Sequence, residues 1–112
     1  MPTVNIFFKE ENDIHKLDAI APQLREYLAD KLSCSSKKLT PSEISIRFIK
    51  TDGGEMIAGI ELEITAHAFP ERVEKQDKIC LEIAGYIKEK IPAIKELQVW
   101  LKLYELGHSW QP

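Results

Sequence analysis

The sequence predicts an α+β fold in which a four-stranded mixed sheet carries helices on one face. Stretches with the two-residue period of strands alternate with stretches that have the three- and four-residue spacing of helices. Their order is strand, helix, strand, a short turn, and the same three again. Because 112 residues suit a single domain, we expect residues 1–112 to fold as one unit whose halves are roughly residues 1–50 and 56–105.

The first half begins with a β-rich segment at residues 4–8. Asn12 or Asp13 can cap the helix that follows a short solvated turn. The apolar stripe of this helix consists of Ile14, Leu17, Ile20, Leu24, Leu28 and Leu32. Pro22 lies inside the stripe, so we expect a kink or a break into two helical pieces there.

A loop rich in serine and lysine over residues 33–42 leads to an alternating strand at residues 44–49. Thr-Asp-Gly-Gly at residues 51–54 has the composition of a turn. Residues 60–65 alternate isoleucine or leucine with glutamate or threonine, which is typical of a half-buried strand. Pro70 then suits the first position of a second helix.

We expect the second helix to end at Pro92 and a last strand to occupy residues 97–104. The inner face of this helix is predicted to consist of Val73, Gln76, Ile79, Cys80, Ile83 and Ile87. Each half pairs parallel strands through a helical crossover, so the helices cover one face of the sheet. The other face carries Arg47, Glu61, Glu63, Trp100, Lys102 and Tyr104. A face of such mixed composition is either solvated or buried against other subunits.

Composition argues against several classes of function. The net charge of −3, from 15 basic and 18 acidic residues, is unlike that of a general nucleic-acid binder. No apolar run approaches the roughly 20 residues of a membrane span, and the N-terminus lacks signal-peptide features, so we expect no membrane association and a cytoplasmic location. Cys34 and Cys80 lack metal-ligand spacing, so we expect no metal and interpret them as small buried thiols.

The feature that could carry chemistry is the first dipeptide, Met1-Pro2. Initiator methionine is usually removed before proline, and its removal leaves Pro2 as a free secondary amine. Burial beside cations lowers the pKa of an amine, so Pro2 could act as a general base near neutral pH. A proline at the second position also occurs widely by chance, and that alternative stays open.

A proline at position two, a strand directly after it and a β-α-β-β-α-β chain of this length together resemble the tautomerase superfamily. This group includes macrophage migration inhibitory factor, 5-carboxymethyl-2-hydroxymuconate isomerase and 4-oxalocrotonate tautomerase. Residues 44–48 look like the second strand of the muconate isomerases, which carries an arginine at the place of Arg47. Residues 99–104 are similar to the last long strand of migration inhibitory factor, with Trp100 where that family has a tyrosine. Residues 108–110, His-Ser-Trp, are similar to a His-x-Trp of some bacterial members.

The resemblance implies a cofactor-free keto-enol tautomerase or isomerase of small 2-oxo or 2-hydroxy unsaturated acids. It also implies a homotrimer, whose pockets lie between subunits and bind a small carboxylate substrate. The site residues implied are Pro2 as general base, Arg47, Lys38 and Arg72 for the substrate carboxylate, and Trp100 and Tyr104 as pocket walls.

Other interpretations stay open. A non-catalytic oligomer of the same fold would serve as an interaction or ligand-binding module. RNA-recognition domains share the element order, but they present aromatic residues where this chain has Glu61 and Glu63, which would repel phosphate. Arg47 lies on the same face as these glutamates, so a cross-strand ion pair competes with substrate binding. The muconate isomerases also carry an arginine just before the second helix, where this chain has Pro70, with Arg72 slightly further on.

Overall fold

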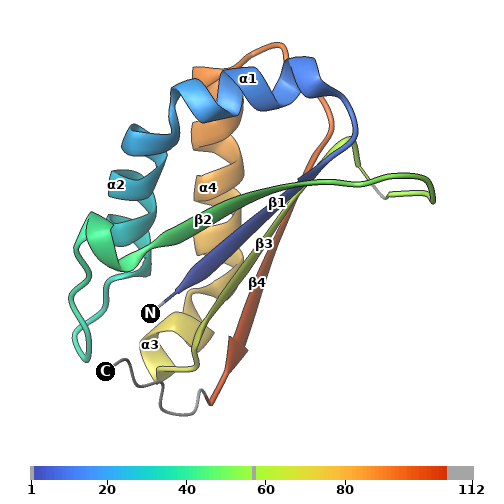
Figure 1. The fold of residues 1–112 in the computed structure, drawn as a ribbon. Coiled ribbons are helices and arrows are strands. Elements are labelled where there is room, and N and C mark those ends of the chain that lie inside the picture. Colours follow the sequence, from blue (N-terminus) through green and yellow to red (C-terminus); the bar gives the residue numbers. More distant parts are fainter. Residues whose placement is uncertain (1, 57, 106–112) are drawn as a thin grey trace, which may run out of the picture.

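Strands and crossover helices follow one another along the chain in the predicted order (Figure 1). The computed structural model describes residues 2–56 and 58–105, except for the side chains of Asn12 and Asp13. The elements are β1 (Thr3–Phe8), α1 (Glu11–Ala19), α2 (Ala21–Leu32), the short 3₁₀ helix η1 (Pro41–Glu43), β2 (Ser45–Lys50), β3 (Ile60–His67), α3 (Pro70–Glu74), α4 (Gln76–Lys90) and β4 (Leu97–Tyr104).

The four strands form one mixed sheet in the order β2-β1-β3-β4. Each half contributes a parallel pair, β1 with β2 and β3 with β4, as the two crossovers predict. The halves join through the antiparallel pairing of β1 and β3, in which Thr3 lies opposite Thr65. The predicted mixed α+β sheet is therefore confirmed, and β2 and β4 form its two edges.

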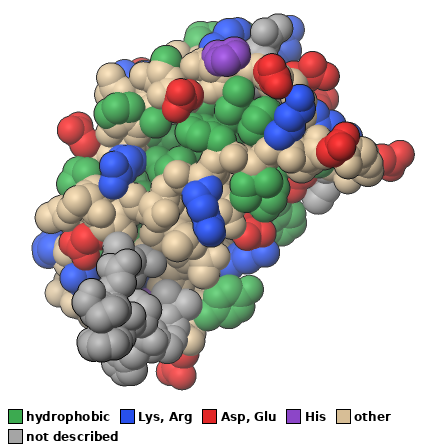
Figure 2. Space-filling view, viewed as in Figure 1, with side chains coloured by type: hydrophobic (Ala, Val, Ile, Leu, Met, Phe, Trp, Pro, Cys, Tyr) green, Lys and Arg blue, Asp and Glu red, His purple; other side chains and the backbone are tan. Residues whose placement is uncertain are grey.

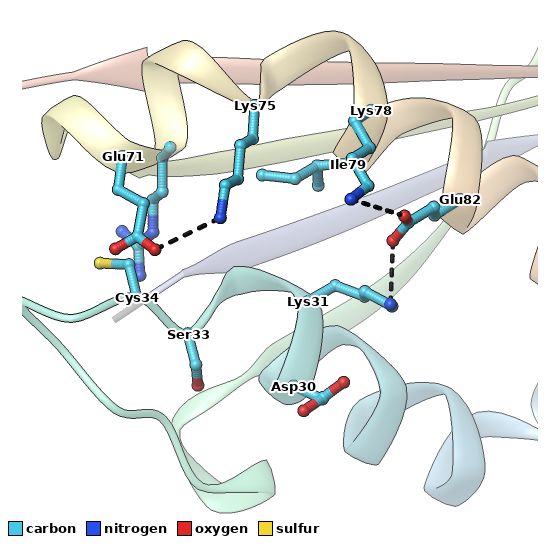
Figure 3. Close-up of a pocket in the computed structure, with 10 residues that line it drawn as sticks. Asp30, Lys31, Ser33, Cys34, Glu71, Lys75, Lys78, Ile79 and Glu82 are labelled. Atoms are coloured by element: carbon cyan, nitrogen blue, oxygen red, sulfur yellow. Dashed lines mark hydrogen bonds and ion pairs between the residues drawn. The ribbon is translucent and has the colours of Figure 1, made fainter.

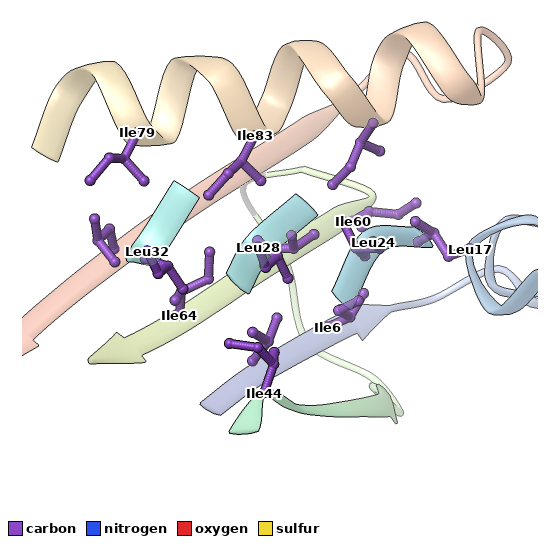
Figure 4. Close-up of a cluster of buried hydrophobic side chains, with 14 of the residues drawn as sticks. Ile6, Leu17, Leu24, Leu28, Leu32, Ile44, Ile60, Ile64, Ile79 and Ile83 are labelled. Atoms are coloured by element: carbon purple, nitrogen blue, oxygen red, sulfur yellow. The ribbon is translucent and has the colours of Figure 1, made fainter. Parts of the chain in front are cut away.

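Helices cover one face of this sheet, and the core lies between the two layers (Figures 1 and 4). Alternate residues of β1 and β3 point toward the helices, as the two-residue period requires. The large side chains that are almost fully buried are Val4, Ile6, Leu17, Leu24, Leu28, Leu32, Ile44, Ile60, Leu62, Ile64, Ile83 and Ile87. These side chains join both β-α-β halves in one cluster.

Both crossovers contain two helical pieces. The break predicted at Pro22 is confirmed, because α1 ends at Ala19 and Pro22 lies in the first turn of α2, where no N–H donor is required. Pro70 begins α3, also as predicted. A second break, at Lys75 between α3 and α4, was not predicted, since no proline or glycine occurs there.

Two local predictions are wrong. Helix α1 begins at Glu11 and has Glu10 at its N-cap, so Asn12 and Asp13 lie inside the helix and do not cap it. Val73 is 51% exposed and does not belong to the inner face of the second crossover. The reason is the break between α3 and α4, which interrupts the apolar stripe of α4 before it reaches Val73.

Candidate functional site

Pro2 lies buried at the start of β1. Its carbonyl oxygen accepts a hydrogen bond of 3.3 Å from the backbone N–H of Ser45, the first residue of β2. Strand β3 runs antiparallel to β1 and ends at His67, beside which β4 ends at Tyr104. Pro2 therefore shares one end of the sheet, here called the Pro2 end, with the start of β2 and the last residues of β3 and β4.

Arg72 is a buried cation at the Pro2 end, with only 3% of its surface exposed. Its Nε donates to the carbonyl oxygen of Leu32 at 2.8 Å, and its Nη1 donates to that of His67 at 3.1 Å. The guanidinium also lies 5.0 Å from the centre of the Phe69 ring. Burial lowers the pKa of Arg72 from its usual value. Arg72 thus connects the last residue of α2 to the end of β3, and these two backbone bonds orient it within its own chain.

The loop between α2 and η1 carries Lys38. This side chain is exposed and forms no hydrogen bond or ion pair with a described residue. The neighbouring Lys37 instead pairs with Glu43 at 3.2 Å. On the other side of the loop, the backbone N–H of Ser35 donates to Oε2 of Glu71 in α3 at 2.7 Å. The loop is therefore held at both ends, while Lys38 remains available to a ligand.

Arg47 lies on the sheet face that no helix of the described residues covers, here called the open face. Its register partner on β1 is Asn5, which in turn pairs with Glu63 on β3. Because β1 separates β2 from β3, the cross-strand ion pair between Arg47 and Glu63 that the sequence left open does not form. Glu63 binds Lys102 at 2.9 Å and Asn5 at 3.4 Å instead. Arg47 is exposed and forms no polar contact with a described residue.

A hollow of about 270 Å³ lies on the part of the open face that β3 and β4 form, and is here called the open-face hollow. Its lining consists of Phe7, Glu61, Glu63, Trp100 and Lys102. Trp100 is 41% exposed, and its indole Nε1 donates to Oε1 of Glu61 at 3.4 Å. The hydrogen bond from Lys102 lowers the pKa of Glu63 and raises that of Lys102, so both are charged at neutral pH.

Within one chain, only some of the predicted site residues lie at the same end of the sheet. Pro2, Arg72 and Tyr104 lie at the Pro2 end, where Tyr104 is 54% exposed. Arg47 and Trp100 lie instead in one row across the middle of the sheet, on β2 and β4 respectively. Their row is three residues along β1 from Pro2, or about 10 Å.

Sequence reasoning assigned no role to three residues that the structure places near these positions. His67 ends β3 at the Pro2 end, where its ring contacts Phe69 with centroids 4.6 Å apart. Phe7 lines the open-face hollow, and Asn5 binds Glu63 beside it. Side chains alternate along β1, which puts Phe7 and Asn5 on the open face, but nothing in the sequence indicated that a hollow forms there.

A separate cavity of about 200 Å³ lies on the helical side, between the end of α2 and the α3–α4 segment (Figure 3). Its charges are largely paired, with Lys75 at 3.4 Å from Glu71 and both Lys31 and Lys78 within 4 Å of Glu82. Within the described residues, no group of three or more acidic, histidine or cysteine side chains could hold a metal ion. We therefore place the candidate site on the sheet and not in this cavity.

The surface seen in Figure 2 intersperses basic with acidic side chains and shows no extended basic patch over the described residues of that side. No helix in the described part of the chain is both long and apolar enough to cross a membrane. Met1 and the His-Ser-Trp sequence at residues 108–110 lie outside the described residues.

Comparison with solved structures identifies the fold. A fused 4-OT, described as an asymmetric trimer, superposes with a TM-score of 0.67 at 12% identity, over 97% of this chain and 94% of that chain. A 5-carboxymethyl-2-hydroxymuconate delta-isomerase gives 0.61 at 7% identity, over 100% and 87%. The chain has the tautomerase-superfamily fold. A Vibrio cholerae protein of unknown function also superposes, with a TM-score of 0.70 at 17% identity over 98% of this chain and 83% of that chain.

Sequence comparison adds nothing to this, since no family model and no curated protein matches the chain. At identities of 7–17%, the structural likeness establishes the tautomerase fold and not an activity. It does confirm the resemblance that the order of elements and the position of Pro2 indicated.

Proposed function

We propose that this protein is a cofactor-free keto-enol tautomerase or isomerase of small 2-oxo or 2-hydroxy unsaturated acids. The observation that carries the proposal is the position of Pro2, buried at the start of β1 in a tautomerase fold. The proposal requires removal of Met1, so that the nitrogen of Pro2 is an amine and not an amide. It places the protein in the cytoplasm as a homotrimer.

Pro2 would act as the general base. Burial disfavours the charged form of an amine, and the buried cation of Arg72 at the same end of the sheet disfavours it further. The neutral amine takes a proton from the substrate carbon while the C–H electron pair moves toward the carbonyl oxygen. Return of the proton to another position of the resulting enolate completes the isomerisation, and the amine is regenerated.

Cations would bind the carboxylate of the substrate and stabilise the enolate charge. Lys38 and Arg47 are suited to direct contact, because both are exposed and neither has a partner among the described residues. Arg72 is oriented by two backbone carbonyls, so we assign it a supporting electrostatic role. Trp100 and Tyr104 would wall the pocket and exclude water.

The pocket would be completed by a second copy of the chain. Arg47 and Trp100 lie about 10 Å along the sheet from Pro2 within one chain, on strands that β1 and β3 separate. A neighbouring subunit could bring its own copies of these side chains to the Pro2 end. Both sheet edges, β2 and β4, are also open to such a neighbour.

The test is the ketonisation of enol phenylpyruvate and of 2-hydroxymuconate, followed by ultraviolet absorbance. It uses protein whose intact mass shows that Met1 has been removed, beside Pro2→Ala prepared in the same way. Loss of a general base lowers turnover by about 10²–10⁴-fold, so we expect Pro2→Ala to lose nearly all activity. Equal rates for the two proteins, or no turnover by either, would contradict the proposal for these substrates.

A non-catalytic tautomerase-fold oligomer, acting as an interaction or ligand-binding module, is the second candidate. Its supporting observation is the set of exposed large apolar side chains Val73, Leu81, Trp100 and Tyr104. It predicts that the wild-type and Pro2→Ala proteins form equally stable oligomers and that neither has turnover.

A further inference from the structure

The cavity between α2 and the α3–α4 segment, here called the helical-side cavity, contains a buried cation without an anionic partner (Figure 3). Arg72 lines this cavity, and only 3% of its surface is exposed. Its Nε and Nη1 donate to backbone carbonyl oxygens, and no carboxylate of the described residues forms an ion pair with it. A buried charge is costly unless it is paired, so Arg72 favours the entry of an anion into the cavity.

Two lysines of the α3–α4 segment extend toward α2 at the same cavity (Figure 3). The Nζ of Lys78 lies 3.9 Å from Oε1 of Glu82, which is too far for a hydrogen bond, and that of Lys75 lies 3.4 Å from Oε1 of Glu71. The Lys75 side chain is 55% exposed and that of Lys78 is 71% exposed. Both ammonium groups are therefore held loosely and can turn toward a ligand.

The carboxylates that line the cavity are occupied by other donors or by solvent. Oε2 of Glu71 accepts from the backbone N–H of Ser35 at 2.7 Å and from its hydroxyl at 3.0 Å. Oε2 of Glu82 pairs with Lys31 at 2.9 Å, and Asp30 is exposed to solvent. The lining contains four cations and three carboxylates, so it has a net positive charge in addition to the unpaired guanidinium.

We propose that the helical-side cavity binds a phosphate group, of inorganic phosphate or of a small phosphomonoester, between Arg72, Lys75 and Lys78. The N–H groups of a planar guanidinium match the spacing of phosphate oxygens, and ammonium groups add point charges to the same anion. A phosphomonoester carries a charge of about −1.5 to −2 at neutral pH, which suits three cations better than a carboxylate does. The volume of about 200 Å³ is ample for a phosphate group.

This inference goes beyond the proposed function and does not depend on it. The helical-side cavity lies on the face of the sheet that the helices cover, so it is separate from the open face. Binding there requires neither a free amine on Pro2 nor a second copy of the chain.

Titration calorimetry with inorganic phosphate at constant ionic strength tests the site. The proteins are wild type, Lys78→Met and the matched control Lys95→Met, which replaces an exposed lysine that does not line the cavity. We expect one saturable site per chain in wild type and in Lys95→Met. Loss of one charge-assisted hydrogen bond should raise the dissociation constant of Lys78→Met by at least about tenfold. Arg72→Lys keeps the charge but not the forked donors, so it should also bind phosphate more weakly.

Thermal unfolding gives a second readout. Bound phosphate stabilises the folded chain by mass action, but phosphate also stabilises proteins in general because it is excluded from their surface. The informative quantity is therefore the rise in melting temperature when phosphate replaces chloride at equal ionic strength. We expect this rise to be larger in wild type and Lys95→Met than in Lys78→Met.

Glycerol 2-phosphate distinguishes the two sources of the phosphate group. Tighter binding than inorganic phosphate would assign the site to a phosphomonoester, and equal or weaker binding would assign it to the free ion.

Three results would overturn the proposal. They are the absence of saturable binding by wild type at millimolar phosphate, an unchanged dissociation constant in both Lys78→Met and Arg72→Lys, and acetate that binds as tightly as phosphate. None of these measurements uses turnover, so the phosphate site and the proposed function succeed or fail separately.

Discussion

The two faces of the sheet differ in how completely contacts within one copy of the chain bury or pair their side chains. On the helix-covered face, Ile6, Leu62 and Ile64 are completely buried against side chains of α2 and α4. On the open face, Arg47 has no polar contact with a described residue, and the side-chain oxygen of Asn5 is buried without a hydrogen-bond partner among the described residues. The helix-covered face therefore accounts for most of the stability of the chain, whereas the open face keeps polar groups that the described residues do not pair.

Truncation of the core should give the largest loss of stability. Leu28 is fully buried between α2 and the sheet, and Leu28→Ala should lower the free energy of unfolding by about 2–5 kcal/mol. The matched control is Leu81→Ala, since Leu81 is 75% exposed on α4 and its truncation should change stability by about 0.5 kcal/mol or less. Urea unfolding measures both, and similar losses would refute the assignment of stability to the helix-covered face.

Replacement of Arg72 should have the next largest effect. Arg72→Met removes the donors to the carbonyl oxygens of Leu32 and His67, which should cost about 1–3 kcal/mol of unfolding free energy. Arg72→Lys retains the charge but not the forked donor geometry, so it should recover only part of the loss. A variant with wild-type stability and a raised KM would show instead that Arg72 binds the substrate directly.

The smallest effect concerns the ion pair of Glu63 and Lys102 on the open face. Lys102 lowers the pKa of Glu63 below 4.5, so this stabilisation is present above pH 4.5 and is lost as the pH falls through the lowered value. Glu63 raises the pKa of Lys102 above 10.5, so the stabilisation by the ion pair is also lost as the pH rises through this raised pKa. Between these limits, Lys102→Met should lower the melting temperature slightly and by a constant amount.

The difference in melting temperature between wild type and Lys102→Met should vanish once the pH has fallen below the lowered pKa of Glu63 and its carboxyl group is protonated. A difference that persists there would show that the aliphatic part of Lys102, and not its charge, stabilises the open face.

The local elements were predictable because their signals are local. The alternation at residues 60–65 predicted β3, the apolar stripe predicted the helical crossover, and Pro22 predicted the break between α1 and α2. The break at Lys75 was not predictable from a proline or glycine, since neither is present. Its consequence, the exposure of Val73, was therefore missed as well.

The candidate site was predictable only in part. Pro2 could be placed from the sequence because it directly precedes β1, and the open face could be assigned because side chains alternate along a strand. Which side chains meet on that face could not be assigned, since it depends on the order of the strands. The sequence left open a pair of Arg47 with Glu63, but β1 lies between them and Lys102 takes that place.

The sequence by itself determined the two β-α-β halves, the face of each strand that is buried, and the presence of a proline at the start of β1. Period and spacing encode these features within a few residues of chain. The tertiary structure alone decided that Arg72 is buried against Leu32, 40 residues away, and that Arg47 is left without a partner among the described residues. The physical reason is that the partners of a charged side chain depend on how segments distant in the sequence pack together. No local sequence pattern specifies that packing.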